Sequence, residues 1–228
     1  MQAIDLEILY YLNLYSQRSV AFDHLVKELS QNNLLKGSIF VSVFWYMWFR
    51  FDSSARPAVI VAIIGSLITM VITRLLALSL PFKLRPRHDP TVDFIMPHGS
   101  RISEVQGNSS FPSDHAALFF AFSTGLYLTN KKAGIVAFIY SILFICLPRL
   151  YLGLHYFSDI LSGALIGSFV IIATMLITRK VPITETILRY EQKYKAVFYA
   201  FFFILSIQLA TMFEDSRALA RIVSQALR

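Results

Sequence analysis

Two short polar segments interrupt an otherwise apolar chain, and both contain side chains that can do chemistry. The first starts at Leu80 and continues through a polar loop to His115. The second covers residues 148–159 and reads PRLYLGLHYFSD. Polar groups beside membrane segments are functional candidates because lipid solvates them poorly. These two segments therefore hold the residues from which a site can be predicted.

A pair of residues in the second segment suits nucleophilic catalysis. His155 and Asp159 stand four positions apart at the predicted start of a helix. At this spacing the carboxylate can reach one imidazole nitrogen and fix the tautomer that presents the other as a nucleophile. His115, just inside another predicted helix, can protonate a departing oxygen. The pattern predicts an acid-base set with a nucleophile.

Cations near these groups indicate an anionic ligand. Lys83, Arg85 and Arg149 bring three positive charges to the two segments, and guanidinium groups bind phosphate oxygens bidentately. Ser113 directly precedes an apolar helix. Its hydroxyl and the first free backbone N–H groups of that helix can form an anion-binding site. The ligand that fits this set is a phosphoryl group.

The composition shows which elements must position these residues. The 228 residues are 56% hydrophobic and 15% charged, with a mean hydropathy of +0.57, which excludes soluble globular and disordered classes. The net charge of +7 could indicate nucleic-acid binding. However, the basic residues are scattered among short loops, as in proteins that meet anionic lipid. Cys146 is alone, so no disulfide forms within the chain.

The apolar runs predict an all-α membrane protein with six transmembrane helices. About twenty apolar residues span a bilayer. Five runs approach this length without a charge: Pro57 to Thr73, Ala116 to Asn130, Ala133 to Pro148, Ile160 to Thr178 and Ala196 to Phe213. A sixth, Gly37 to Phe49, is shorter, but Leu34 and Leu35 extend it if Lys36 snorkels to the headgroups. The spacing of Gly163 and Gly167 is either a helix-packing signal or a chance occurrence.

Six spans place both polar segments on the side of the termini and three short basic connections on the other side. The positive-inside rule makes those connections cytoplasmic. Residues 1–34 carry apolar positions at helical spacing and form an expected interfacial segment, before a membrane domain at 35–213. The tail 214–228 is either a second amphipathic segment or a frayed end. It places Leu219, Ile222, Val223 and Leu227 opposite Arg217, Arg221 and Arg228.

Three motifs in this order resemble a known family. They are Arg85-Pro86, Pro112-Ser113-x-His115 and Arg149-x5-His155-x3-Asp159. Together they resemble the signature of the type 2 phosphatidic acid phosphatase (PAP2) superfamily, whose membrane-bound members dephosphorylate lipid phosphates and diphosphates without a metal.

The resemblance implies a role for each matched residue. His155 would form a phosphohistidine, Asp159 would be its partner and His115 the general acid, later the base that activates water. Arg85, Arg149 and Ser113 would hold the phosphate oxygens. No cofactor is implied, and the implied partners are a lipid phosphate or diphosphate and the bilayer.

Three positions depart from the family pattern. The lysine that usually lies seven residues before the first-motif arginine is Leu78 here, so either Lys83 or Arg74 supplies that charge. Asp114 stands where glycine is usual, and it either repels substrate, caps the helix or binds an arginine. Pro148 replaces a serine that commonly precedes the third-motif arginine.

Several interpretations compete with the phosphatase. Four loop residues could bind a divalent ion, although their spacing matches no compact site: His88, Asp89, Asp93 and His98. Asn108 begins a glycosylation sequon. A transporter would need ionisable residues within the spans, which the apolar runs lack.

The expected enzyme is a bacterial inner-membrane phosphatase that faces outward and acts on undecaprenyl diphosphate. The alternatives are a phosphatidic acid or phosphatidylglycerol phosphate phosphatase, or a phosphotransferase that uses lipid A as the acceptor.

Overall fold

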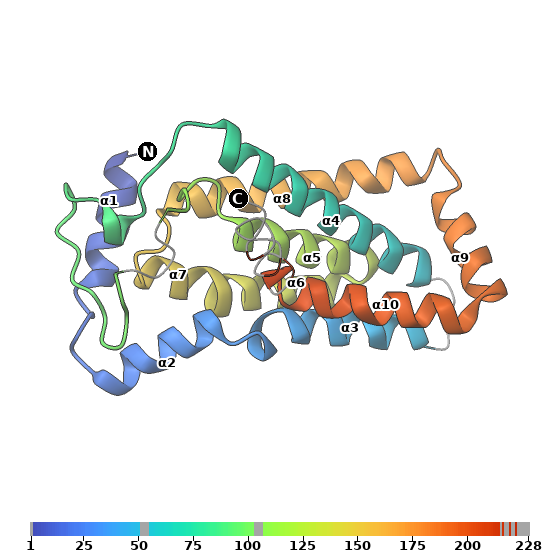
Figure 1. Ribbon diagram of the computed structural model, residues 1–228, viewed down its shortest axis with the longest axis horizontal. Coiled ribbons are helices and arrows are strands. Elements are labelled where there is room, and N and C mark those ends of the chain that lie inside the picture. Colours follow the sequence, from blue (N-terminus) through green and yellow to red (C-terminus); the bar gives the residue numbers. More distant parts are fainter. Residues whose placement is uncertain are drawn as a thin grey trace.

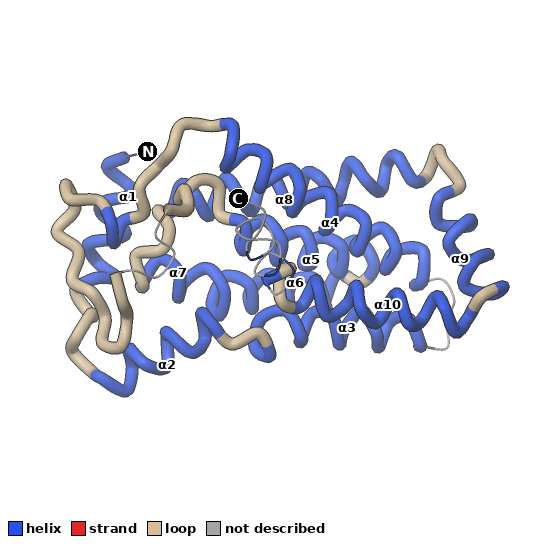
Figure 2. The backbone as a smooth tube through the Cα atoms, viewed as in Figure 1, coloured by secondary structure: helices blue, strands red, loops and turns tan. Residues whose placement is uncertain are grey.

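The computed structural model describes residues 2–50, 55–102 and 107–214, with the single positions Ser216, Leu219 and Ile222. Throughout this part of the chain the regular structure is helical and no strand occurs (Figure 2). The all-α class predicted from the sequence is therefore confirmed. The predicted faces of the tail depend on Val223, Leu227 and three arginines, which lie outside the described residues.

Ten α-helices form the molecule within the described ranges. Their bounds are α1 (Gln2–Asn13), α2 (Val20–Gln31), α3 (Ile39–Phe49), α4 (Ala55–Ser79), α5 (Asp114–Thr129), α6 (Lys131–Tyr140), α7 (Leu147–Tyr151), α8 (Phe157–Thr178), α9 (Ile183–Lys193) and α10 (Lys195–Ala210). Two π-helical segments continue neighbouring helices, Leu34–Ser38 before α3 and Ser141–Cys146 between α6 and α7.

Three of the described helices are long and apolar enough to cross a membrane, and a fourth span results if α9 and α10 count as one broken span. The three are α4, the continuous helix Lys131–Tyr151, and α8. Six spans are thus not confirmed. The π-helical start and α3 together form only a short apolar helix, Leu34–Phe49, α5 has 16 residues, and the chain bends by 120° between α9 and α10.

Helix α5 lies at the centre and carries one wall of the candidate site. It packs against α4, α6 and α8, and its apolar side chains from Ala116 to Phe122 are mostly inaccessible. Gly163 and Gly167 of α8 face the backbone of α5, where an added Cβ would collide with the carbonyl oxygens of Ser113 and Ala117. The glycine pair is therefore confirmed as a close-packing contact.

The non-helical segments gather at one end of the molecule. Residues 80–102 and 107–113, apart from the short 3-10 helix Pro86–His88, run as a loop beside α1, α2 and α7, whereas α9 lies at the opposite end (Figure 1). Helices α1 and α2 pack against α7, and α1 also contacts the start of α8. The N-terminal helices therefore cover the end that holds both polar segments.

Lys36 does not reach the headgroups in the way that the sequence predicted. Its side chain is only 3% exposed, because the π-helical segment that carries it packs between α10 and the second π-helical segment. Lys36 is a buried cation.

Candidate active site

The two ring nitrogens of His155 have different neighbours. Nδ1 lies 2.7 Å from the carbonyl oxygen of Ser110, so it carries the proton and donates it. Nε2 then holds the lone pair, and Nη1 of Arg85 lies 3.4 Å from it. His155 is buried, 3% exposed. Burial and the charge of Arg85 lower the pKa of His155 well below its usual value, which keeps Nε2 unprotonated and nucleophilic.

Asp159 makes no hydrogen bond with His155, which corrects the pairing predicted from their spacing. One carboxylate oxygen of Asp159 accepts from Lys83 Nζ at 2.7 Å. The other accepts from the Ser110 hydroxyl at 2.6 Å and from the backbone N–H of Tyr156 at 2.8 Å. Helix α8 begins at Phe157, so His155 lies in the bend before the helix and the four-residue helical spacing does not apply. Asp159 instead holds the residue whose carbonyl orients the imidazole.

Arg85 is fixed by carbonyl groups on both sides of the site. Its Nη1 donates to Leu154 at 2.8 Å, and Nε and Nη2 donate to the carbonyls of Asn108 and Ser109 at 3.2 and 3.3 Å. Burial lowers the pKa of Arg85, but a guanidinium stays charged at neutral pH. The positive group is thereby held against the nucleophilic nitrogen.

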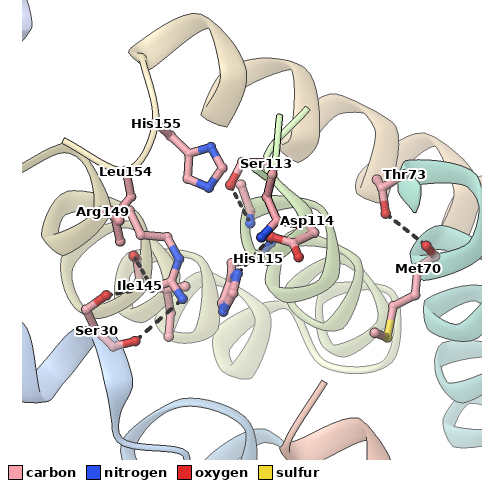
Figure 3. A network of polar contacts seen from close by, with 12 residues as sticks. Ser30, Met70, Thr73, Ser113, Asp114, His115, Ile145, Arg149, Leu154 and His155 are labelled. Atoms are coloured by element: carbon pink, nitrogen blue, oxygen red, sulfur yellow. Dashed lines mark hydrogen bonds and ion pairs between the residues drawn. The ribbon is translucent and has the colours of Figure 1, made fainter. Parts of the chain in front are cut away.

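Arg149 enters the site from the other side. Its guanidinium donates to Ser30 Oγ and to the carbonyls of Ser30 and Ile145 at 3.3 to 3.5 Å (Figure 3). The side chain is 3% exposed. Pro148, which lacks an N–H, follows the π-helical segment. Such π-bulges occur frequently at functional sites.

The start of α5 brings His115 and Asp114 into the site. Asp114 Oδ1 lies 2.8 Å from both the backbone nitrogen and Nδ1 of His115. Nδ1 of His115 therefore donates to the carboxylate, and Nε2 is left as the reactive atom. Nε2 is buried and has no hydrogen-bond partner within the described structure. Figure 3 shows His115, Asp114 and Ser113 at the end of α5, with the His155 ring across from them.

The anion-binding position predicted at the start of α5 is filled by side chains of the protein, which accept from the first backbone N–H groups of the helix. The Ser113 hydroxyl accepts from the backbone N–H of Ala116 at 3.4 Å, and Asp114 takes the N–H of His115. Ser113 is completely buried. It acts as the cap of α5 in this structure, and its own N–H donates to the carbonyl oxygen of Asp159.

The structure separates the two candidates for the missing first-motif charge. Lys83 joins the cluster through Asp159 and also contacts Ser158 Oγ at 3.2 Å and the face of Tyr156. Arg74 is exposed on α4. Lys83 is the one brought to the site, although it faces Asp159 rather than an open position.

Two supporting residues could not be found from the sequence patterns. Ser110 is fully buried and links Asp159 to His155, although its position had suggested only a glycosylation sequon. Asp5 of α1 is buried and accepts from the N–H and hydroxyl of Ser158 at 2.7 and 2.6 Å. Its sole sequence signal was a carboxylate within an apolar helical pattern.

The divalent-ion interpretation of the polar loop is not supported. Asp89 accepts from the Thr91 backbone and hydroxyl and from Tyr156 Oη, while His88 contacts the carbonyl of Ile102. No group of three potential ligand side chains occurs within the part of the chain that the structure describes.

The comparisons agree with the motifs. The sequence profile of the PAP2 superfamily matches residues 58–183. Lipid A 1-diphosphate synthase from Escherichia coli K12 is 27% identical over 202 residues, which cover 83% of this chain and 81% of that protein. Undecaprenyl-diphosphatase BcrC from Bacillus subtilis is 29% identical over 157 residues, covering 64% of this chain and 76% of that protein.

A solved structure shares the fold. The crystal structure of Aquifex aeolicus LpxE matches with a TM-score of 0.53 at 22% identity, over 75% of this chain and 93% of that one. Residues 58–183, which match the profile of the PAP2 superfamily, contain all three sequence motifs.

Proposed function

This chain belongs to the PAP2 superfamily and is a membrane phosphatase of that family, and from this premise we propose that it hydrolyses undecaprenyl diphosphate through a phosphohistidine at His155. The observation that carries the proposal is the fixed tautomer of His155. Its Nδ1 is bound to a carbonyl, and its Nε2 lies unprotonated beside Arg85. This is the arrangement needed for attack on a phosphorus atom whose oxygens face a guanidinium.

The first half-reaction transfers the terminal phosphoryl group to the enzyme. Nε2 of His155 forms a bond to phosphorus while the bond to the bridging oxygen breaks. Arg85 and Arg149 stabilise the charge on the phosphoryl oxygens. His115 gives a proton from Nε2 to the departing lipid phosphate, while Asp114 accepts from Nδ1 and orients the ring.

The second half-reaction releases inorganic phosphate. Neutral His115 accepts a proton from water through Nε2, and the resulting hydroxide attacks the phosphohistidine. The phosphorus–nitrogen bond breaks, and the electron pair returns to Nε2 of His155. Ser110 and Asp159 hold the ring throughout because the carbonyl contact to Nδ1 is not used in either step.

We further propose six membrane crossings, with α3 and α5 completing the spans and α10 entering from α9. The site would face the outside of a bacterial inner membrane. Basic residues at the opposite end support this orientation, since Lys131, Lys132, Arg179 and Lys180 are exposed there. Residues 1–34 would lie at the membrane surface. Their exposed aromatic side chains, Tyr10, Tyr11, Tyr15 and Phe22, suit the headgroup region.

The test is phosphate release in detergent, with EDTA present, from undecaprenyl diphosphate, phosphatidic acid and phosphatidylglycerol phosphate. Wild type should prefer the diphosphate, and His155→Ala should be inactive. An acid-labile, base-stable phosphoenzyme should form in wild type and be absent from His155→Ala. Activity in the alanine variant, or its loss with chelator, contradicts the mechanism.

A second candidate is phosphoryl transfer to a lipid acceptor. It is favoured by the similarity to lipid A 1-diphosphate synthase, which covers 81% of that protein. The same phosphohistidine would then be attacked by a lipid phosphate instead of water. Incubation of the phosphoenzyme with lipid A separates the two, because transfer moves the label to the lipid and hydrolysis releases it as inorganic phosphate.

A further inference from the structure

The helical hairpin of residues 2–31, formed by α1 and α2, buries polar side chains and exposes apolar ones. Its buried positions include Asp5 and Asn13 on α1 and Asp23 and Ser30 on α2. Its outer face carries large apolar and aromatic side chains that are between 46% and 63% exposed: Tyr10, Tyr11, Tyr15, Val20, Phe22 and Leu25. A helix on the surface of a soluble protein shows the opposite arrangement. Each face of the hairpin therefore needs its own explanation.

The inner face of the hairpin is bound to the ends of two membrane spans. At the start of α8, the backbone N–H and the hydroxyl of Ser158 donate to Asp5 at 2.7 and 2.6 Å. At the end of the apolar helix Lys131–Tyr151, the hydroxyl of Tyr151 donates to Asp23. Helix α1 thus holds the end of one span and α2 the end of another. These contacts place the hairpin at the level where both spans leave the membrane.

The same inner face reaches the catalytic groups. Arg149 donates to the hydroxyl and to the carbonyl oxygen of Ser30 at 3.4 and 3.5 Å. Ser158 accepts from Lys83 at 3.2 Å and directly precedes Asp159 in the sequence. The position of Arg149 therefore depends on α2, and the position of the first turn of α8 depends on α1.

The outer face suits the boundary between lipid headgroups and hydrocarbon. Tyrosine rings are enriched at this boundary because they are apolar with one polar end, and α1 runs across the direction of α8 in Figure 1. The exposed Arg18 lies 5.4 Å from the centre of the Tyr15 ring, and such cations are attracted to anionic lipids. Glu7 is exposed on α1, which fits the headgroup level and not the hydrocarbon interior. The partner that matches this face is a lipid surface.

On the basis of the proposed function, we propose that the outer face of the hairpin binds the lipid surface around the active-site end, and that this contact holds Arg149 and the start of α8 where phosphoryl transfer needs them. Asp5, Asp23 and Ser30 are positioning residues, because they act through the side chains that they bind. Away from lipid, the apolar face is exposed to water, and the hairpin loses the contact that keeps its polar face on the span ends. The hairpin lies outside the segment that matches the family profile.

The first experiment locates the outer face in nanodiscs of phosphatidylglycerol and phosphatidylcholine. A bimane label on Tyr11→Cys, in a Cys146→Ser background, should be quenched by phosphatidylcholine that carries bromine on its acyl chains. The same label on Asp93→Cys, an exposed position of the polar loop, should be quenched by iodide in the water. Quenching of the Tyr11→Cys label by iodide alone overturns the lipid contact. Protection from both quenchers also overturns it, because a protein partner or a second copy then covers the face.

The second experiment measures the effect of the outer face on catalysis. Tyr10→Ser and Tyr11→Ser are combined in one variant, which is assayed in nanodiscs on geranyl diphosphate, a substrate short enough to arrive from water. We expect kcat to fall about 5- to 20-fold and KM to change less than about threefold, since Arg85 still binds the phosphoryl group. Tryptophan at both positions should keep wild-type kcat, because it prefers the same boundary. The matched control combines Tyr190→Ser and Tyr194→Ser, which removes an exposed ring pair at the opposite end and should match wild type.

Hydrogen exchange separates positioning from a general loss of structure. In the variant with serine at positions 10 and 11, the amides of residues 149–158 should exchange faster, while those of α5 keep their wild-type rates. Faster exchange in both segments overturns the inference, because the whole fold has then loosened. An unchanged kcat, or an equal loss in the control with serine at positions 190 and 194, overturns it as well. A wild type that hydrolyses no diphosphate but shows the expected quenching and exchange contradicts only the proposed hydrolysis.

Discussion

The carbonyl oxygen of Ser110 lies 2.7 Å from Nδ1 of His155 and fixes the tautomer of the nucleophile. The same residue donates its hydroxyl to Asp159. Asp159 therefore acts on His155 through Ser110, by holding the loop whose carbonyl meets the ring. Because a carbonyl is neutral, it orients the imidazole without adding a negative charge next to Nδ1.

Ser110→Ala tests this relay, because it removes the hydroxyl and keeps the carbonyl. We expect kcat to fall about tenfold with little change in KM, since the carbonyl loses its anchor and a buried carboxylate loses one donor. Steady-state kinetics measure both constants. Ser79→Ala is the control, because Ser79 is an exposed serine that bonds only its own helix. An unchanged kcat in Ser110→Ala would mean that Asp159 acts on His155 by another route.

The pH profile should depend on Arg85. Burial, the larger cause, and the charge of Arg85 both lower the pKa of His155 from 6.5. Nε2 is therefore unprotonated above that lowered value, and activity governed by His155 is lost only when the pH falls through it. Arg85→Gln removes the second cause, so the pKa should rise toward 6.5 and the acid limb of kcat/KM should move to higher pH.

Profiles of wild type, Arg85→Gln and Arg179→Gln on one substrate check this shift. Arg179 is exposed at the other end of α8, so its variant should follow wild type. The substrate titrates identically in all three measurements, and a difference in the limb therefore reports on the enzyme. Coincident acid limbs in wild type and Arg85→Gln would exclude a role for this charge.

The sequence predicted the helical class and the motif residues because these depend on local composition and spacing. Apolar runs give helices in lipid, and the motif residues were brought to one end of the molecule as predicted. The count of spans was less predictable. It depends on breaks such as the 120° bend between α9 and α10 and the π-helical segments, which have no strong signal in composition.

The partners of the site residues could not be predicted from spacing. Asp159 was assigned to His155 because four residues make one helical turn, but α8 starts after His155. The actual contact involves a backbone carbonyl, and any residue type can supply one. Asp5 and Ser30 come from helices far away in the sequence, so only the tertiary structure shows that they reach Ser158 and Arg149.

Asp5 should stabilise the active-site end of α8. It accepts from the backbone N–H and hydroxyl of Ser158 in the first turn of that helix. Asp5→Ala leaves both donors without this acceptor, and loss of such a cap costs about 1–2 kcal/mol. We expect the melting temperature in detergent to fall by about 2–8 °C. Glu7→Ala, an exposed carboxylate on the same helix, should leave it unchanged, and an equal fall in both variants would point to α1 as a whole.

Lys83 and Arg74 should differ in their effect on activity. Lys83→Met removes the cation that faces Asp159 and should lower kcat/KM, because the carboxylate is free to move away from Ser110. Arg74→Met removes an exposed charge on α4 and should change kcat/KM less than about twofold. Assays of both variants on one lipid substrate decide between them. A larger loss in Arg74→Met would reverse the assignment.

Gly167 should be required for the approach of α8 to α5. An alanine Cβ there would collide with the carbonyl of Ala117, and this part of α5 follows directly from Ser113 and His115. Overpacking costs about 1–3 kcal/mol, while replacing a helical glycine by alanine returns up to about 1 kcal/mol. Gly167→Ala should therefore be destabilised by roughly 1–2 kcal/mol and lose activity as His115 shifts. Leu165→Ala, on the exposed face of α8, should change neither thermal stability nor phosphate release. A Gly167→Ala protein with wild-type stability and wild-type activity would contradict the requirement for a glycine at this contact.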